Sequence, residues 1–145
     1  MSLALEIKKP LEAITNPEDI PHFASVVASA FSNDVVNRYL YLGRDSRPDH
    51  PKLQPDLRAK YWERVITPRF QDRALLIQSH DWAAVALWLP PGVEKPPPNP
   101  AIVSEGGLEY RDFFDALRKE KLGSRLHWHL NLIARNPVRD DGGKI

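Results

Sequence analysis

Two groups of residues near the C-terminus have types and spacings suited to chemistry: a pair of histidines and a polar loop with two glycines. His127 and His129 stand one residue apart in the stretch HWHLNLIAR. Apolar and polar residues alternate here, which predicts a half-buried β-strand over His127–Ala134. We expect Leu130, Leu132 and Ala134 on one face of this strand, and His129, Asn131 and Ile133 on the other.

The two histidines allow three roles. Histidine titrates near neutral pH, so either ring could act as a general base. A His-x-His pair could also supply two metal ligands, but the sequence offers no clear third ligand near it. The commonest role for such residues is structural, as hydrogen-bonded and half-buried rings. We therefore expect no metal site and retain His129 as the candidate catalytic base.

The polar loop follows Asn136–Pro137, where proline cannot donate to a sheet ladder. Glycines let a backbone approach a ligand closely, and a nest of N–H groups beside a cation can hold a phosphate. Phosphate binding is therefore one interpretation of this loop, and a charged, frayed chain end is the other. The loop residues are Arg139, Asp140, Asp141, Gly142, Gly143, Lys144 and Ile145.

The composition is ordinary for a globular chain and argues against several classes of function. Among 145 residues, 20 are basic and 19 acidic, and a net charge of +1 does not suit a general nucleic-acid surface. No apolar run approaches the roughly 20 residues of a membrane span, and the N-terminus lacks the apolar region of a signal peptide. The absence of cysteine excludes disulfides and thiol catalysis. We expect one cytoplasmic domain over residues 1–145, without nucleic-acid or membrane partners.

Residue patterns predict three helices in the first half of the chain. Asn16–Pro17, followed by two acids, is a helix start, and this helix should run to about Phe31. A short helix over Val35–Leu42 comes next. A third is expected over Asp56–Phe70, with Pro68 ending or kinking it. Its inward residues should be Leu57, Tyr61 and Val65, with Trp62 as a further candidate.

Three further strands are predicted. Leu3–Lys8 alternates apolar and polar residues, and Ala74–Gln78 and Ala83–Leu89 are apolar runs joined by a tight connection at Ser79–Trp82.

An amphipathic helix over Leu108–Leu122 should follow a proline-rich loop and end at Gly123. Its inward residues should be Tyr110, Phe113, Phe114 and Leu117, with Leu122 as a further candidate. The resulting order, β-α-α-α-β-β-α-β, predicts an α+β fold.

This order and the C-terminal segment resemble the GNAT-type N-acetyltransferases, and in particular their puromycin-N-acetyltransferase-like branch. The family pattern is an apolar strand ending Leu-Ala-Val-x-Pro, followed by Gln/Arg-x-x-Gly-x-Gly/Ala; here the strand reads IARNP over residues 133–137. The loop can be aligned in two registers, one from Asp140 with Gly143 and Ile145 in the glycine places, the other from Arg139 with Gly142 and Lys144, and neither completes the pattern. LWLPPG at 87–92 and HWHL at 127–130 also resemble stretches of this branch.

The resemblance implies transfer of an acetyl group from acetyl-CoA to a primary amine of a small molecule, with a protein amine less favoured. It also implies a mixed, largely antiparallel sheet flanked by helices. By position, Ile133, Ala134 and Arg135 would bind the pantetheine arm, and Arg139 to Ile145 the phosphates. Asn33 and Asp34 would lie on the substrate side; otherwise they are a helix stop whose side chains satisfy backbone groups.

The resemblance covers roughly residues 4–145 and stops inside the acetyl-CoA loop, before the cofactor-binding helix. If the domain ends there, the His127–Ala134 strand has an exposed edge, and we expect weak or absent acetyl-CoA binding. The alternative is a non-catalytic interaction or regulatory module, in which this edge takes a strand from another chain or from a second copy. A third hypothesis, a His-x-His metal protein, would require stoichiometric zinc or iron.

Overall fold

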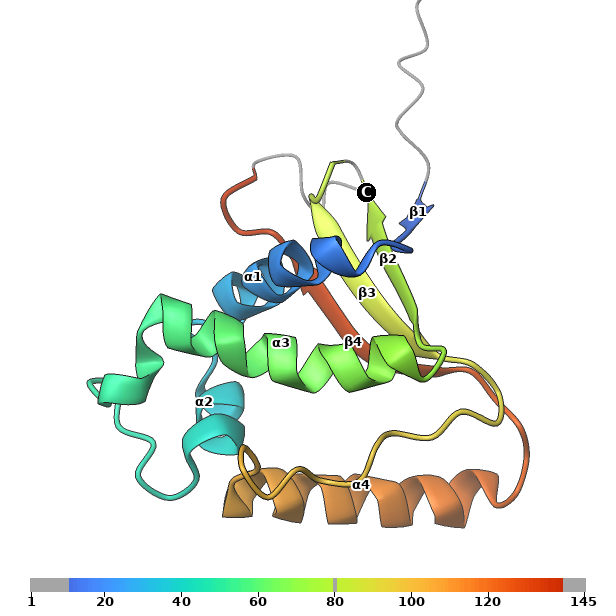
Figure 1. The fold of residues 1–145 in the computed structure, drawn as a ribbon. Helices are drawn as coiled ribbons and strands as arrows, with labels where there is room; N and C mark the ends of the chain where they lie inside the picture. The colour runs from blue at the N-terminus through green and yellow to red at the C-terminus, as the bar shows by residue number, and fades with distance from the viewer. Residues whose placement is uncertain (1–10, 80, 140–145) are drawn as a thin grey trace, which may run out of the picture.

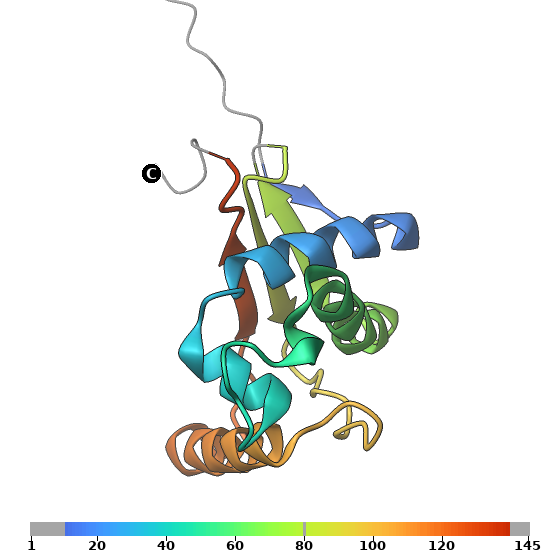
Figure 2. The same ribbon diagram turned by 90° about the vertical axis from the view of Figure 1, so that its left-hand side faces the viewer.

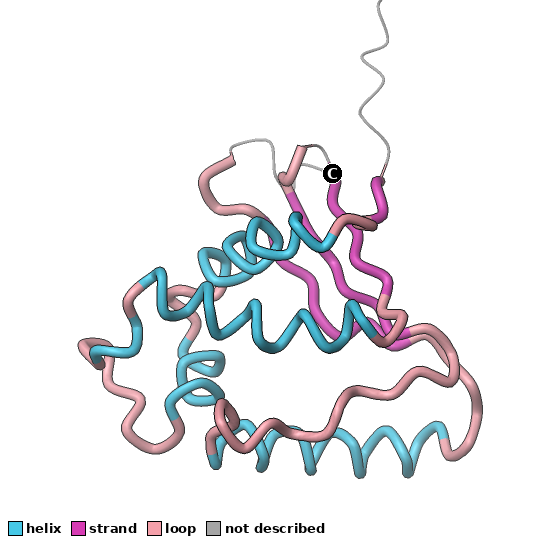
Figure 3. Tube along the Cα trace, in the orientation of Figure 1, coloured by secondary structure: helices cyan, strands magenta, loops and turns pink. Residues whose placement is uncertain are grey.

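The computed structural model describes residues 11–79 and 81–139, which form an α+β fold with four α-helices and a four-stranded sheet (Figures 1 and 3). From the first helix onward, the elements follow one another in the order predicted from the sequence, and a short strand over residues 12–13 that was not predicted precedes them. The expected strand over residues 3–8 lies outside the described residues, as do Asp140, Asp141, Gly142, Gly143, Lys144 and Ile145 of the polar loop.

The sheet is antiparallel, with the strand order β1-β2-β3-β4. Its strands are β1 (Glu12–Ala13), β2 (Leu75–Ser79), β3 (Ala84–Leu89) and β4 (His129–Arg135). The predicted pair β2 and β3 is confirmed, and the turn between them places Asp81 and Trp82 at positive φ values of 55° and 69°. β1 and β4 are the two edges of the sheet within the described part of the chain.

Polar side chains cap the 3-10 turn that leads into α1, the start of α2 and the 3-10 turn before α3, whereas α1 and α3 themselves begin without a side-chain cap. A 3-10 turn over Pro17–Asp19 leads into α1 (Ile20–Ala30), and the Asn16 side chain accepts a hydrogen bond from the Glu18 amide. The second helix, α2 (Val35–Leu42), has the predicted bounds, with Asp34 as its N-cap. A second 3-10 turn (Pro51–Leu53) precedes α3 (Pro55–Gln71).

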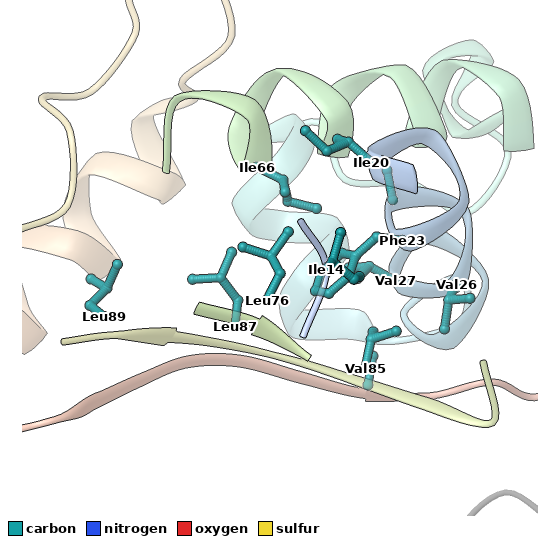
Figure 4. Packing of buried hydrophobic residues seen from close by; sticks show 12 residues of the cluster. Ile14, Ile20, Phe23, Val26, Val27, Ile66, Leu76, Val85, Leu87 and Leu89 are labelled. Carbon is teal, nitrogen blue, oxygen red and sulfur yellow. The ribbon is translucent and has the colours of Figure 1, made fainter. Parts of the chain in front are cut away.

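The core lies between α1, α3 and one face of the sheet. α1 and α3 lie side by side in front of the strands in Figure 1, and Figure 4 shows Phe23, Ile66 and Leu87 pointing toward one another. These three side chains are fully buried. Burying each contributes about 1.5–3 kcal/mol. The opposite face of the sheet carries no helix from the described residues (Figure 2).

The predicted bounds of α3 are confirmed to within one residue at each end, and its predicted inward face is wrong. The helix does not end at Pro68, which stands in the last turn and deprives only one carbonyl, that of Arg64, of a helical partner. The buried residues are Arg58 and Ile66, so the inward face is turned by one position from the one predicted through Leu57, Tyr61 and Val65. Trp62, the further candidate, lies on this face and packs against the core, so that prediction is confirmed. A buried arginine carries no apolar signal, which is why the pattern misplaced the face.

The fourth helix, α4 (Glu105–Leu122), also departs from prediction. It starts three residues early, because the Ser104 side chain caps it by accepting from the Gly107 amide. Its apolar residues do not point inward: Phe113 is 63% exposed, and Tyr110, Phe114 and Leu117 are also exposed. α4 instead meets α2 through Gly106, where an added Cβ would lie 2.8 Å from the Tyr39 ring. The predicted end at Gly123, with φ of 58°, is confirmed.

A β-bulge in β4 overturns the predicted alternation of that strand. Leu87 of β3 pairs with Leu132, but the next residue, Trp88, pairs with Leu130, so Asn131 is an extra residue. An extra residue shifts the faces of the strand. His129 therefore pairs with buried Leu89 and shares a face with Leu132 and Ala134, while Leu130 lies on the outer face.

Candidate functional site

A cleft of about 730 Å³ opens where the end of β3 and the start of β4 meet α4. We call it the α4–β4 cleft. Its walls come from the end of β3, the loop after it, one side of α4 and the segment leading into β4. The lining residues are Leu89, 92–95, Arg111, Asp115, Arg118, Lys119, 123–127 and His129.

Asp115 is the centre of an ion cluster in this cleft. Its carboxylate accepts from Lys95 Nζ at 2.7 Å and Arg118 Nη2 at 3.1 Å, and Arg111 Nε lies at 3.7 Å. Burial alone would raise the pKa of Asp115, but the hydrogen bond from Lys95 and the surrounding positive charges lower it below the ordinary value. The cluster ties α4 to the loop before it while leaving more positive than negative charge in the cleft.

His129 is held in its neutral form beside this cluster. Arg118 Nη1 lies 2.9 Å from His129 Nδ1, and a guanidinium can only donate, so the ring nitrogen must accept. Burial and the charges of Arg118 and Lys95 lower the pKa of His129 to about 4. The imidazole is therefore uncharged at neutral pH, and its Nδ1 lone pair is engaged by Arg118.

His127 has a different environment, although it also lines the cleft. Its Nδ1 lies 2.8 Å from the Arg125 carbonyl, and it precedes the first residue of β4. The strand predicted over His127–Ala134 therefore begins two residues later than expected, and His127 lies outside it. Within residues 11–79 and 81–139, no three His, Cys, Asp or Glu side chains gather as a metal site would require.

Asn33 and Asp34 do not belong to the α4–β4 cleft. Asp34 Oδ1 accepts from the Asn37 amide at 2.6 Å, which satisfies the free N–H at the start of α2. Neither residue lines the cleft. Asp34 therefore has the structural role that the sequence analysis gave as the alternative to substrate contact: its side chain satisfies a backbone group at the start of a helix.

The residues predicted to contact a pantetheine arm lie on the free edge strand. Ala134 is buried in the core, Ile133 is 63% exposed, and Arg135 is exposed. Their side chains thus point alternately to the two faces of the sheet, and any pantetheine contact would use the backbone of the unpaired edge. Arg139, the one loop residue described, donates from its side chain to the Asp81 carbonyl at 2.5 Å.

Sequence reasoning missed the charged residues of the cleft. Arg111, Asp115 and Arg118 are four and three residues apart, a spacing that places them on one helix face. That spacing was a usable signal. No pattern, however, could connect this face with Lys95 and His129, which reach it from other segments.

Comparison with protein-family models and with curated proteins finds no match to this chain. None of the helices in the described ranges has the length and apolarity needed to cross a membrane.

Proposed function

We propose that this protein is an N-acetyltransferase of the GNAT type, which transfers an acetyl group from acetyl-CoA to a primary amine of a small molecule. The observation that carries the proposal is a neutral His129, placed at a bulge on an edge strand and opening into a cleft. Bulges are common next to active sites, because they redirect a side chain. The four antiparallel strands, with helices in the order that the family resemblance implies, support it further.

In this proposal the amine nitrogen attacks the thioester carbonyl carbon. A C–N bond forms, the C–S bond breaks, and coenzyme A leaves as a thiolate that takes up a proton. His129 Nδ1 accepts the proton that the amine loses, after the amine displaces Arg118 from that nitrogen. The acceptor occupies the α4–β4 cleft, and the thioester approaches along the outer edge of β4.

The cofactor side of the proposal uses backbone more than side chains. The unpaired edge at Ile133, Ala134 and Arg135 would hydrogen-bond the pantetheine arm. The phosphates would lie at Arg139 and the residues after it, Asp140 to Ile145. Calorimetric titration with acetyl-CoA tests cofactor binding separately from catalysis. If the folded protein gives no heat of binding, the proposed cofactor site is contradicted.

The acetyl-transfer proposal is tested by measuring coenzyme A release from acetyl-CoA in the presence of a panel of primary amines. Replacing a general base lowers the rate by about 10²–10⁴-fold, so His129→Gln should do the same. His22→Gln is the matched control, because it removes an exposed imidazole of α1 that does not line the cleft, and it should retain near-normal rates. Full activity in a folded His129→Gln protein would contradict the assigned role.

A second function, pairing through the β4 edge, is favoured by one observation. β4 has no strand partner on its outer side among the described residues, and Leu130 and Ile133 are exposed on it. An open apolar edge can accept a strand from another chain. Light scattering tests this: a stable complex that Ile133→Lys abolishes would support the module, and a monomer that binds acetyl-CoA would support the enzyme.

A further inference from the structure

We propose that the α4–β4 cleft binds an oxyanion group, so that the acceptor is a small amine that also carries a carboxylate or a phosphate. The evidence for the anion site is the set of charges and contacts in the cleft, which does not depend on the proposed function. Only the statement that the bound molecule is the acetyl acceptor rests on the proposed function.

The first support is the imbalance of charge in the cleft. The whole chain has a net charge of only +1. The cleft lining alone contains five cationic side chains against two carboxylates, with both histidines left out of this count. The cations are Lys95, Arg111, Arg118, Lys119 and Arg125, and the carboxylates are Glu94 and Asp115. A concave site with one sign of charge concentrates ligands of the opposite sign.

The second support is that this charge is not neutralised internally. Asp115 is a single carboxylate shared by Lys95, Arg111 and Arg118. Among residues 11–79 and 81–139, neither Lys119 nor Arg125 is ion-paired with a carboxylate. The side chain of Arg125 instead donates to the carbonyls of Lys121 and Leu122. The cleft therefore has a surplus of cationic donors, and charged hydrogen bonds to a carboxylate or phosphate are the strong ones.

The third support is that one cation of the cleft, Arg118, contacts the candidate base. Arg118 contacts Asp115 through Nη2 and His129 through Nη1. An anion held by Arg118, Lys119 and Arg125 would thus place an attached amine beside the His129 ring. It would also offset the positive charges that lower the pKa of His129, and so make the ring a better base when the acceptor is bound.

The site can be tested on the full chain by following the His129 ring signals by NMR during titration at constant ionic strength. The probes are inorganic phosphate, phosphoethanolamine and β-alanine, with ethanolamine as the control that has the amine but no anionic group. We expect saturable shifts from the anions, a higher His129 pKa in their presence, and no saturable shift from ethanolamine. Tighter binding of phosphoethanolamine than of β-alanine would identify phosphate as the group, and the reverse would identify carboxylate.

Charge-removing variants sharpen this test. Losing two partly exposed charge contacts should weaken anion binding about tenfold in Lys119→Gln/Arg125→Gln. Lys121→Gln is the matched control, because it removes one charge from the same helix outside the cleft, and its affinity should match that of the unmodified protein. Equal responses to anions and ethanolamine, or equal affinities in the double variant and the control, would overturn the site.

Acetyl-transfer assays with the same amines separate the two proposals. Saturable anion binding without any transfer would leave the anion site standing and contradict the acetyltransferase function. Equal transfer to ethanolamine, β-alanine and phosphoethanolamine would leave the function standing and overturn the inference about the acceptor.

Discussion

The core and the α4 layer are held to the molecule by different forces. In the core, side chains such as Phe23 and Leu87 are completely buried between helices and sheet. In α4, the comparable aromatic residue Phe113 is 63% exposed, and the helix is attached through a glycine contact and an ion cluster. Apolar burial is stronger and less sensitive to pH and salt than partly exposed ion pairs.

This contrast places the candidate site at the junction of a strongly and a weakly held region. His129 belongs to the sheet, whereas Arg118 and Asp115 belong to α4. A change in the core should therefore unfold the whole molecule, while a change in the α4 contacts should open the cleft and leave the sheet intact. Four predictions test this difference.

The largest effect is expected for Phe23→Ala, which removes a fully buried ring from α1. Such truncations cost about 3–5 kcal/mol of the unfolding free energy. Urea denaturation followed by circular dichroism should show one cooperative transition at a much lower midpoint. A loss below 1 kcal/mol, a small fraction of that range, would mean that this region is not the stable part of the molecule.

A smaller and more local effect is expected for Gly106→Ala at the contact of α4 with α2. The added Cβ would lie 2.8 Å from the ring and 2.9 Å from the backbone oxygen of Tyr39. Overpacking of this kind costs about 1–3 kcal/mol. Hydrogen exchange should speed up in α4 but not in β2 or β3. Gly107→Ala, whose closest neighbour would be at 3.2 Å, should have a weaker effect.

A pH-dependent loss of stability should come from His129. Its folded-state pKa of about 4 lies below the ordinary 6.5, so the unfolded chain binds more protons between these values. Stability should fall as pH decreases from 6.5 to 4. After allowance for solvent screening at a half-buried ring, the loss should be about 1–2 kcal/mol.

Urea midpoints measured across this range check the prediction, and His129→Gln should flatten the curve there. Asp115 contributes only at the acid end of this range, because its lowered pKa means that its own loss of stability sets in as the pH approaches 3.8. An unchanged slope in His129→Gln would assign the pH dependence to other groups.

The smallest effect is expected for Phe113→Ala, the same type of truncation as in the core but on the exposed side of α4. Surface changes of this kind usually stay within about 0.5 kcal/mol. Urea denaturation in parallel with Phe23→Ala gives the comparison directly. A cost similar to that of Phe23→Ala would show that another part of the protein covers this face of α4.

The sequence predicted the elements better than their faces. Capping residues and helix- or strand-breaking residues are local signals. They predicted both bounds of α2 correctly and the first residues of β2 and β3 to within one position. The face that an element buries depends on tertiary contacts, which local signals do not contain. The buried faces of α3 and α4 differ from the predicted ones at Arg58 and at the Tyr39–Gly106 contact, and the bulge at Asn131 exchanges the two faces at the start of β4.

The candidate site was predictable only in part. His129 was identified from its type and position, and its neutral state follows from contacts that no periodicity reveals. Lys95, Asp115 and His129 come from three separate segments, so their meeting depends on the path of the loop before α4. The capping role of Asp34 was the simpler of the two readings of that residue.

The antiparallel strand order also has a consequence for the folding pathway. β2 and β3 are joined by a short turn, whereas residues 90–128 separate β3 from β4. Contacts between distant segments bear a larger loop-closure entropy and tend to form late. We therefore expect β4 to join a hairpin that already exists, so that Leu132→Ala raises the unfolding rate in stopped-flow experiments and barely changes the folding rate. A slower folding rate would instead place β4 in the nucleus. On this pathway the cleft exists only after the last strand has docked.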